Sequence, residues 1–76
     1  MITLGVGIDT CFCSTYQYVE IESCKTGTDL IRMFGYDPKQ YCLISNLTGY
    51  KLSNSMKISL IDKLSWGSVD IVKKYF

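Results

Sequence analysis

The sequence predicts one small α+β domain, in which a sheet of four or five strands is packed by a single short helix. Three observations predict this class: the first residues alternate in polarity with a period of two, a segment with helix-capping residues follows, and three further strand-like segments come after it. A chain of 76 residues has room for one domain, and an apolar content of 47% is typical of a chain that buries a core. We therefore expect residues 1–76 to fold as a single unit.

The N-terminal segment predicts a β-hairpin. Apolar side chains alternate there with small or polar ones, at Ile2, Leu4, Val6 and Ile8. This period is typical of a strand that buries one face. Residues 15–22 are rich in tyrosine and β-branched residues, and they predict a second strand with Val19 and Ile21 facing inward. Residues 9–14 are then the connection between the two strands.

The next segment predicts a short helix. Thr26 is a candidate N-cap, Asp29 lies where a capping box places its acidic residue, and Gly35 is a candidate C-cap. The intervening apolar side chains are Leu30, Ile31, Met33 and Phe34. A helix of about two and a half turns is marginal by itself. We therefore expect packing of Leu30, Met33 or Phe34 to hold it on the sheet.

The second half of the chain predicts the remaining strands. Pro38 prevents the helix from continuing, because proline disfavours helical geometry in the residue before it. Residues 41–45 predict a third strand and residues 50–52 a short returning one, joined by the turn at 46–49.

The last twenty residues predict a cover for the core and a final strand. A single helical turn is expected from an apolar cluster, Ile58, Leu60, Ile61 and Leu64. Residues 65–68 turn the chain, and we expect Trp66 there to be partly buried. Val69 and Ile71 then place the inner face of the final strand in the core.

The charges of the chain are balanced. Eight basic and seven acidic residues are mixed along it, and Lys73 with Lys74 is the nearest approach to a basic patch. This balance predicts no general attraction to nucleic acid or anionic membranes. The N-terminus lacks the basic region of a secretory signal, and no apolar run is long enough to span a bilayer, so the expected location is the cytoplasm.

The residues that carry chemistry are few. Without histidine the chain lacks the commonest general base and metal ligand, so we expect no catalysis, no cofactor and no metal. The cysteines are Cys11, Cys13, Cys24 and Cys42. Reduced thiols are the favoured interpretation, with Cys24 and Cys42 packing as small hydrophobes. Disulfides, a four-cysteine zinc site and a Cys11–Cys13 redox pair are the alternatives, but the spacing lacks the paired knuckles of a zinc site.

Two glycines interrupt the first strand pattern. Gly5 and Gly7 lie in a segment that otherwise alternates regularly. Glycine inside a strand often marks a place where another backbone or side chain approaches the sheet closely. We expect such an approach here and no phosphate-binding loop.

Taken in order, these features resemble ubiquitin and its relatives over essentially the whole chain. Residues 35–40 are similar to the exit of ubiquitin's helix, and Leu43 and Ile44 precede a turn that ends at Gly49 and is followed by Leu52. The later matches are residues 60–64, which resemble a late turn, and residues 67–72, which resemble the closing strand. The resemblance implies a ubiquitin-like β-grasp fold with a mixed sheet and one helix packed across it.

The resemblance also implies a binding surface. Ile44 and Val72 match apolar positions on ubiquitin's binding face, and we expect them, with Tyr50, to form a partner-binding surface unless Tyr75 and Phe76 cover them. The chain ends in Lys73-Lys74-Tyr75-Phe76, where ubiquitin and the sulfur carriers have Gly-Gly. Conjugation and sulfur carriage are therefore not expected.

The function expected is that of a non-catalytic, non-conjugating protein-interaction module, an adaptor or accessory subunit. The small ubiquitin-like accessory proteins of bacterial type VII secretion are one concrete version. A small inhibitor encoded by a virus or mobile element is one alternative, and a carrier activated at its C-terminus by a partner enzyme is another. The partner is expected to be a protein, not nucleic acid or a membrane, and an exposed edge of the last strand could support a homodimer.

Overall fold

The computed structural model describes residues 1–9 and 14–74. In this part of the chain it has five strands and two helices. The strands are β1 (Ile2–Asp9), β2 (Ser14–Ile21), β3 (Tyr41–Ser45), β4 (Lys51–Leu52) and β5 (Ser68–Lys73), and the helices are α1 (Gly27–Met33) and α2 (Ile58–Ser65). The expectations for Cys11, Cys13, Tyr75 and Phe76 lie outside the described residues.

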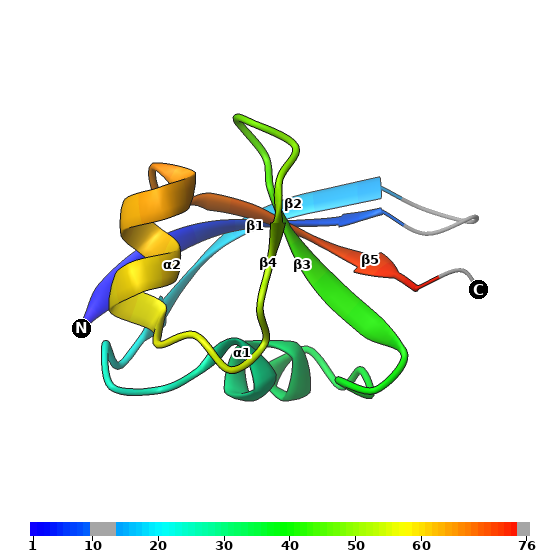
Figure 1. The fold of residues 1–76 in the computed structure, drawn as a ribbon, viewed down its shortest axis with the longest axis horizontal. Helices are drawn as coiled ribbons and strands as arrows, with labels where there is room; N and C mark the ends of the chain where they lie inside the picture. Colours follow the sequence, from blue (N-terminus) through cyan, green and yellow to red (C-terminus); the bar gives the residue numbers. More distant parts are fainter. Residues whose placement is uncertain (10–13, 75–76) are drawn as a thin grey trace.

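The strands form one mixed sheet (Figure 1). Their order is β2-β1-β5-β3-β4, and β1 and β5 are the parallel pair, whereas the other neighbours are antiparallel. Parallel neighbours need a long crossover connection, and here the chain between β1 and β5 supplies both helices and three strands. The predicted α+β, ubiquitin-like β-grasp fold is confirmed, with two helices in place of one.

The final strand lies in the centre of the sheet. β5 pairs with β1 on one side and with β3 on the other, so its backbone groups are already engaged on both sides. The expectation that the edge of the last strand is exposed is therefore wrong. The edge strands of the described sheet are β2 and β4.

Helix α1 is capped as the sequence predicts. The backbone amide of Thr26 donates a hydrogen bond of 3.0 Å to the carboxylate of Asp29, and its hydroxyl donates another of 3.2 Å to the same oxygen. After the helix, Gly35 has a φ of +82°, a left-handed conformation that glycine adopts at little cost. Leu30 and Ile31 are fully buried, whereas Met33 is exposed and does not hold the helix on the sheet.

Helix α2 is longer than the single turn expected. It runs for eight residues and buries Ile58, Ile61 and Ser65, while Leu60 and Leu64 are exposed. The prediction placed all four apolar side chains of this segment over the core. It is confirmed for Ile58 and Ile61 and wrong for Leu60 and Leu64, because the third inward position is Ser65, whose hydroxyl donates a hydrogen bond of 2.6 Å to the carbonyl of Ile61.

Trp66 follows α2 and lies on the surface. Its side chain is 80% exposed, so the expected partial burial is wrong. Trp66 has a φ of +57° and Gly67 a φ of +77°, and the amide of Gly67 donates to the carbonyl of Asp62. The chain reverses direction through these left-handed residues, and the indole is left on the outside of the turn.

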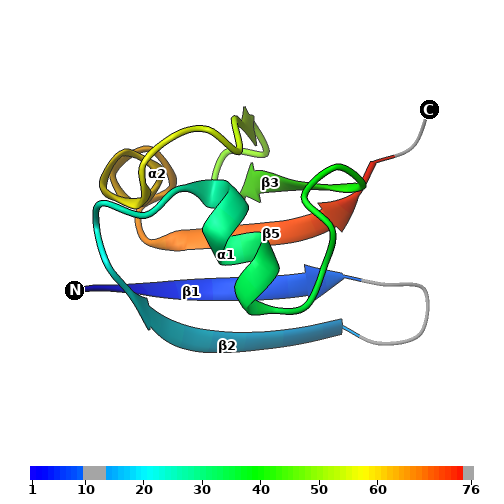
Figure 2. The same ribbon diagram turned by 90° about the horizontal axis from the view of Figure 1, so that it is seen from below.

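The core lies between one face of the sheet and the two helices. Its side chains are Leu4, Val6, Ile21, Leu30, Ile31, Leu43, Leu52, Ile58, Ile61, Val69 and Ile71. Val19 packs partly buried against this cluster, as predicted. Helix α1 crosses the core face (Figure 2), and neither helix lies over the opposite face of the described sheet (Figure 1).

The two described cysteines have different environments. Cys42 is buried in β3, as expected. Cys24 is exposed, because it lies in the turn after β2, where its thiol donates a hydrogen bond of 3.7 Å to Glu22. Its expected packing as a small hydrophobe is therefore wrong.

The described helices are also too short to cross a lipid bilayer: neither α1 nor α2 has the necessary length or apolar content.

Candidate partner-binding surface

The face of the sheet turned away from the core is called here the outer face. Successive side chains of a strand point to opposite faces, so the register of the ladders assigns its members. They are Thr3, Gly5 and Gly7 of β1, Tyr16, Tyr18 and Glu20 of β2, Cys42 and Ile44 of β3, Lys51 of β4, and Ser68, Asp70 and Val72 of β5. Because no described helix covers it, this face presents most of these side chains to solvent.

The glycines of β1 allow Tyr16 to lie across the sheet. A Cβ atom at Gly5 would collide with the hydroxyl end of Tyr16, and one at Gly7 would be in van der Waals contact with the ring. The ring thus passes over β1, and its hydroxyl forms a hydrogen bond of 2.8 Å with the hydroxyl of Ser68 on β5. The predicted close approach of a side chain to Gly5 and Gly7 is confirmed.

Asp70 gives the outer face a polar centre. It lies directly across from Gly7 on one side and Ile44 on the other. A Cβ atom at Gly7 would collide with its carboxylate, which shows how closely Asp70 approaches β1. The side-chain amide of Asn46 donates hydrogen bonds of 3.2 Å to both carboxylate oxygens and fixes their orientation.

An aromatic pair forms the β2 border of the outer face. The rings of Tyr16 and Tyr18 are 5.5 Å apart and nearly perpendicular, at 86°. Such an edge-to-face arrangement is favoured by the ring quadrupoles. Tyr18 is 72% exposed, so one ring of the pair is almost entirely available for contact.

Two of the three predicted site residues come together on this face. Ile44 pairs with Asp70 while Val72 pairs with Cys42, so Ile44 and Val72 are diagonal neighbours on adjacent strands and are within side-chain reach of each other. Both are half-buried. Tyr50 is not part of the ladder: it precedes β4, is 75% exposed, and its carbonyl accepts the amide hydrogen of Ser45.

The sequence did not identify Tyr16, Asp70 and Asn46 as parts of this surface. The one available signal was the pair of glycines in β1, which indicates a close approach without saying by which residue. The partners depend on the register between strands that are far apart in the chain, and that register is a property of the folded sheet.

The described residues offer no metal-binding cluster. Among residues 1–9 and 14–74, no three His, Cys, Asp or Glu side chains gather closely enough to hold an ion. Cys11 and Cys13, which the zinc and redox alternatives require, lie outside these residues.

The comparison with solved structures identifies the architecture. The chain is similar to an NMR structure described as a computationally designed protein based on the template of human erythrocytic ubiquitin, with a TM-score of 0.64 and 15% sequence identity. The likeness covers 100% of this chain and 95% of that one. The fold is ubiquitin-like. No protein-family model and no curated protein matches the chain, so the likeness is one of fold alone.

Proposed function

We propose that this ubiquitin-like domain is a protein-interaction module that docks non-covalently through its outer face, with Ile44 and Val72 at the apolar centre of the contact. One observation carries the proposal: the fold places these two side chains as diagonal neighbours on a sheet face that neither described helix covers. An apolar pair at such a position lowers the free energy of association when a partner removes it from water.

The surroundings of the pair have the composition of a protein interface. Asp70 and Lys51 flank Ile44 in the same cross-strand row, and the Tyr16–Tyr18 pair lies at the far border. Interfaces combine an apolar centre with a polar rim and are enriched in tyrosine. The charged neighbours of Ile44 set the orientation of a partner more than they set its affinity.

The role that fits such a surface is that of an adaptor or accessory subunit. The domain would act by bringing a larger protein into position, without catalysis and without a covalent bond. An accessory subunit of a bacterial secretion machine is one concrete form of this role, and the identity of the captured partner decides the form.

Affinity capture with two matched variants tests the proposal. Tagged wild-type protein, Ile44→Ala/Val72→Ala and Leu60→Ala/Leu64→Ala are used to capture partners from cells of the source organism, under native and denaturing conditions. The leucine variant truncates two apolar side chains that are more exposed and that lie on α2 instead of the sheet. We expect the outer-face variant to recover about tenfold less partner, since burial of the apolar area that these two half-buried side chains still expose accounts for about 1.4 kcal/mol.

Circular dichroism of both variants must show folded protein before the recoveries are compared. The proposal fails if Ile44→Ala/Val72→Ala retains the partner, or if Leu60→Ala/Leu64→Ala loses it equally. A partner that survives denaturant and reducing agent would overturn the non-covalent mechanism and establish a covalent carrier.

A further inference from the structure

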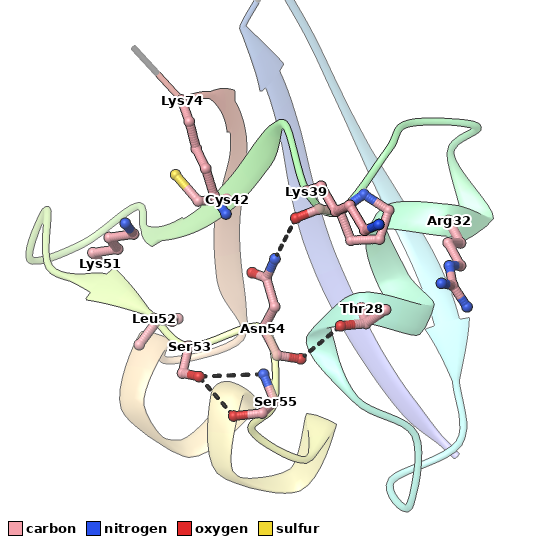
Figure 3. A pocket seen from close by; sticks show the side chains of 11 residues that line it. Thr28, Arg32, Lys39, Cys42, Lys51, Leu52, Ser53, Asn54, Ser55 and Lys74 are labelled. Atoms are coloured by element: carbon pink, nitrogen blue, oxygen red, sulfur yellow. Dashed lines mark hydrogen bonds between the residues drawn. The ribbon is translucent and has the colours of Figure 1, made fainter. Parts of the chain in front are cut away.

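A groove with a volume of about 810 Å³ runs along the β3–β4 side of the molecule (Figure 3). Its lining comes from the exposed side of α1, the connection from α1 to β3, the strands β3 and β4, residues 53–55 and residue 74. Elements from four separate parts of the sequence therefore meet there.

The groove gathers positive charge. Four of the eight basic side chains of the protein line it, Arg32, Lys39, Lys51 and Lys74. No acidic residue of the described part of the chain lines it, and the rest of the full sequence holds four basic and seven acidic residues. The charges are thus balanced along the sequence but separated in space, which gives the groove a positive potential on a nearly neutral molecule.

Nearby carboxylates are engaged elsewhere. Their described hydrogen bonds are those of Asp29 with Thr26, of Asp37 with the backbone amide of Lys39, and of Asp70 with Asn46. The second uses the backbone of Lys39 and not its ammonium group, whereas the guanidinium of Arg32 contributes to lowering the pKa of Asp29. The repulsion among Lys39, Lys51 and Lys74 can therefore be relieved by an external anion.

The floor of the groove is held together by the hydrogen bonds of Asn54. The side-chain amide of Asn54 donates hydrogen bonds of 3.0 Å to the carbonyl of Pro38 and 3.3 Å to that of Tyr41. The carbonyl of Asn54 accepts bonds of 2.9 Å from the amide and 3.2 Å from the hydroxyl of Thr28. Asn54 thus ties the loop after β4 to α1 and to the start of β3. A preorganised floor reduces the ordering cost of binding.

The cations lie on both sides of this floor. In Figure 3, Lys74 and Cys42 lie on one side of the Asn54 side chain, and Lys39 and Arg32 lie on the other. The backbone amide of Lys74 donates a hydrogen bond of 2.8 Å to the carbonyl of Gln40, which fixes that end of the groove. Charges spread along an open groove fit a ligand with several separated negative charges better than one compact anion.

We propose that this groove binds an extended acidic segment of a partner protein, whose Asp and Glu carboxylates pair with Lys39 and Lys74 on either side of Asn54. The groove borders the outer face, because Cys42 pairs with Val72 and Lys51 pairs with Ile44. A partner docked on that face can extend an acidic segment around β3 and β4 into the groove. The groove and the outer face share Cys42 and Lys51 at their border, but Lys39 and Lys74 line the groove alone, so each surface can fail its own test.

The chemistry of the lining favours a peptide over nucleic acid. Grooves for single-stranded nucleic acid present aromatic rings on which bases stack, and among residues 1–9 and 14–74 no aromatic side chain lines this groove. Its polar groups and the apolar surface of Pro38 and Leu52 suit a peptide backbone with short acidic side chains.

Fluorescence anisotropy with a defined probe tests the groove without any knowledge of the natural partner. The probe is a fluorescein-labelled peptide of five Glu-Gly repeats, and its control is the same peptide with Gln in place of Glu. Lys39→Gln/Lys74→Gln is compared with Lys57→Gln/Lys63→Gln, which removes the same charge from α2 and its N-cap, outside the groove.

We expect the full-length protein to bind the Glu peptide and not the Gln peptide, with NMR shifts of backbone amides centred on residues 39–42 and 51–55. The groove variant should bind about tenfold more weakly, and the control variant within about twofold of wild type. Arg32→Gln/Lys51→Gln provides a second groove variant if the first does not fold.

Four results would overturn the inference. Equal losses in the groove and control variants would show that only net charge matters. Equal binding of the Gln peptide, or no binding of the Glu peptide, would remove the role of the carboxylates. Tighter binding of an oligomer of ten thymidines, with the same amide shifts, would make nucleic acid the occupant. The first groove variant changes only Lys39 and Lys74, and neither belongs to the outer face defined above. A negative result in this test therefore leaves the proposed role of Ile44 and Val72 intact.

Discussion

Gly5 and Gly7 show how much of the outer face depends on the absence of a side chain. Each glycine leaves room above β1 that a Cβ atom would fill, and the ring of Tyr16 and the carboxylate of Asp70 occupy that room. The hydrogen bond between Tyr16 and Ser68 then links two strands that are not neighbours in the sheet. The two glycines thus determine the shape of a surface that extends over three strands.

Asp29 is a second single residue with a measurable effect, because its negative charge stabilises the folded state. Its pKa lies below the usual value of 3.8, chiefly because its carboxylate accepts the backbone amide hydrogen of Thr26, with smaller contributions from the Thr26 hydroxyl and from Lys25 and Arg32. Loss of solvation opposes this shift. A carboxylate with a lowered pKa in the folded state stabilises the fold above its unfolded pKa, and this contribution disappears as the pH falls through the folded pKa.

We therefore predict that Asp29→Asn lowers the free energy of unfolding at pH 7 and that the difference from wild type shrinks as the pH falls below 3.8. Urea denaturation at a series of pH values measures both effects. Glu20→Gln, which removes a charge from the exposed surface of β2, is the control. A difference between Asp29→Asn and wild type that is the same at pH 7 and pH 2 would contradict this assignment of the shift.

At the scale of elements, α2 shows how a prediction from the apolar pattern can assign exposed residues to the buried face of a helix. The inward positions are Ile58, Ile61 and Ser65, whereas Leu60 and Leu64 form an exposed apolar row on the other side. Counting apolar residues therefore assigned Leu60 and Leu64 to the core together with Ile58 and Ile61, whereas only the two isoleucines are buried. The inward serine is tolerated because the helix itself supplies its hydrogen-bond acceptor.

The end of α2 carries strain that a substitution can relieve. Trp66 adopts a left-handed conformation that costs a residue with a Cβ roughly 1–2 kcal/mol, while its exposed ring returns little by burial. We predict that Trp66→Gly raises the free energy of unfolding by about 0.5 kcal/mol, after the greater entropy of glycine in the unfolded chain is subtracted. Urea denaturation followed by circular dichroism measures the change, because the variant lacks the single tryptophan.

Trp66→Ala separates backbone strain from the loss of the ring. Alanine retains the Cβ atom, so this variant should not gain stability. If Trp66→Gly instead destabilises the protein as much as Trp66→Ala does, the indole makes contacts that matter more than the strain.

At the scale of the whole molecule, the sheet is completed by β5. This strand inserts between β1 and β3, so the core cannot be completed before β5 has paired with both of them. Ile71 lies at this junction, fully buried and opposite both Ile8 and Leu43. The pairing of distant segments makes folding cooperative and adds loop-closure entropy to the barrier.

We predict that Ile71→Ala lowers the free energy of unfolding by about 2–5 kcal/mol, a large fraction of the total for a domain of this size. The neighbouring variant Val72→Ala, on the outer face of the same strand, should cost about 1 kcal/mol because Val72 is half-buried and leaves no cavity in the core. Denaturant titration of both variants compares the two faces directly. Equal losses would mean that the outer face is covered, and would remove the basis for docking at Val72.

The sequence by itself determined the elements whose evidence is local. Alternation gave β1 and a strand-favouring composition gave β2, each to within one residue, and cap residues gave α1. These inferences depend on residues within a few positions of one another, where the geometry of the chain fixes which side chains share a face. The order of the elements gave the resemblance to ubiquitin, and that resemblance implied that Ile44 and Val72 lie outside the core.

Only the tertiary structure decided which distant residues meet. It placed Tyr16 over Gly5, moved β5 from an expected edge to the centre, and gathered Arg32, Lys39, Lys51 and Lys74 into one groove. A count of charges along the chain predicts no field, because it contains no information about distance. The separation of charge arises when strands and helices from different parts of the sequence pack around a common core, and electrostatic interaction depends on that spacing.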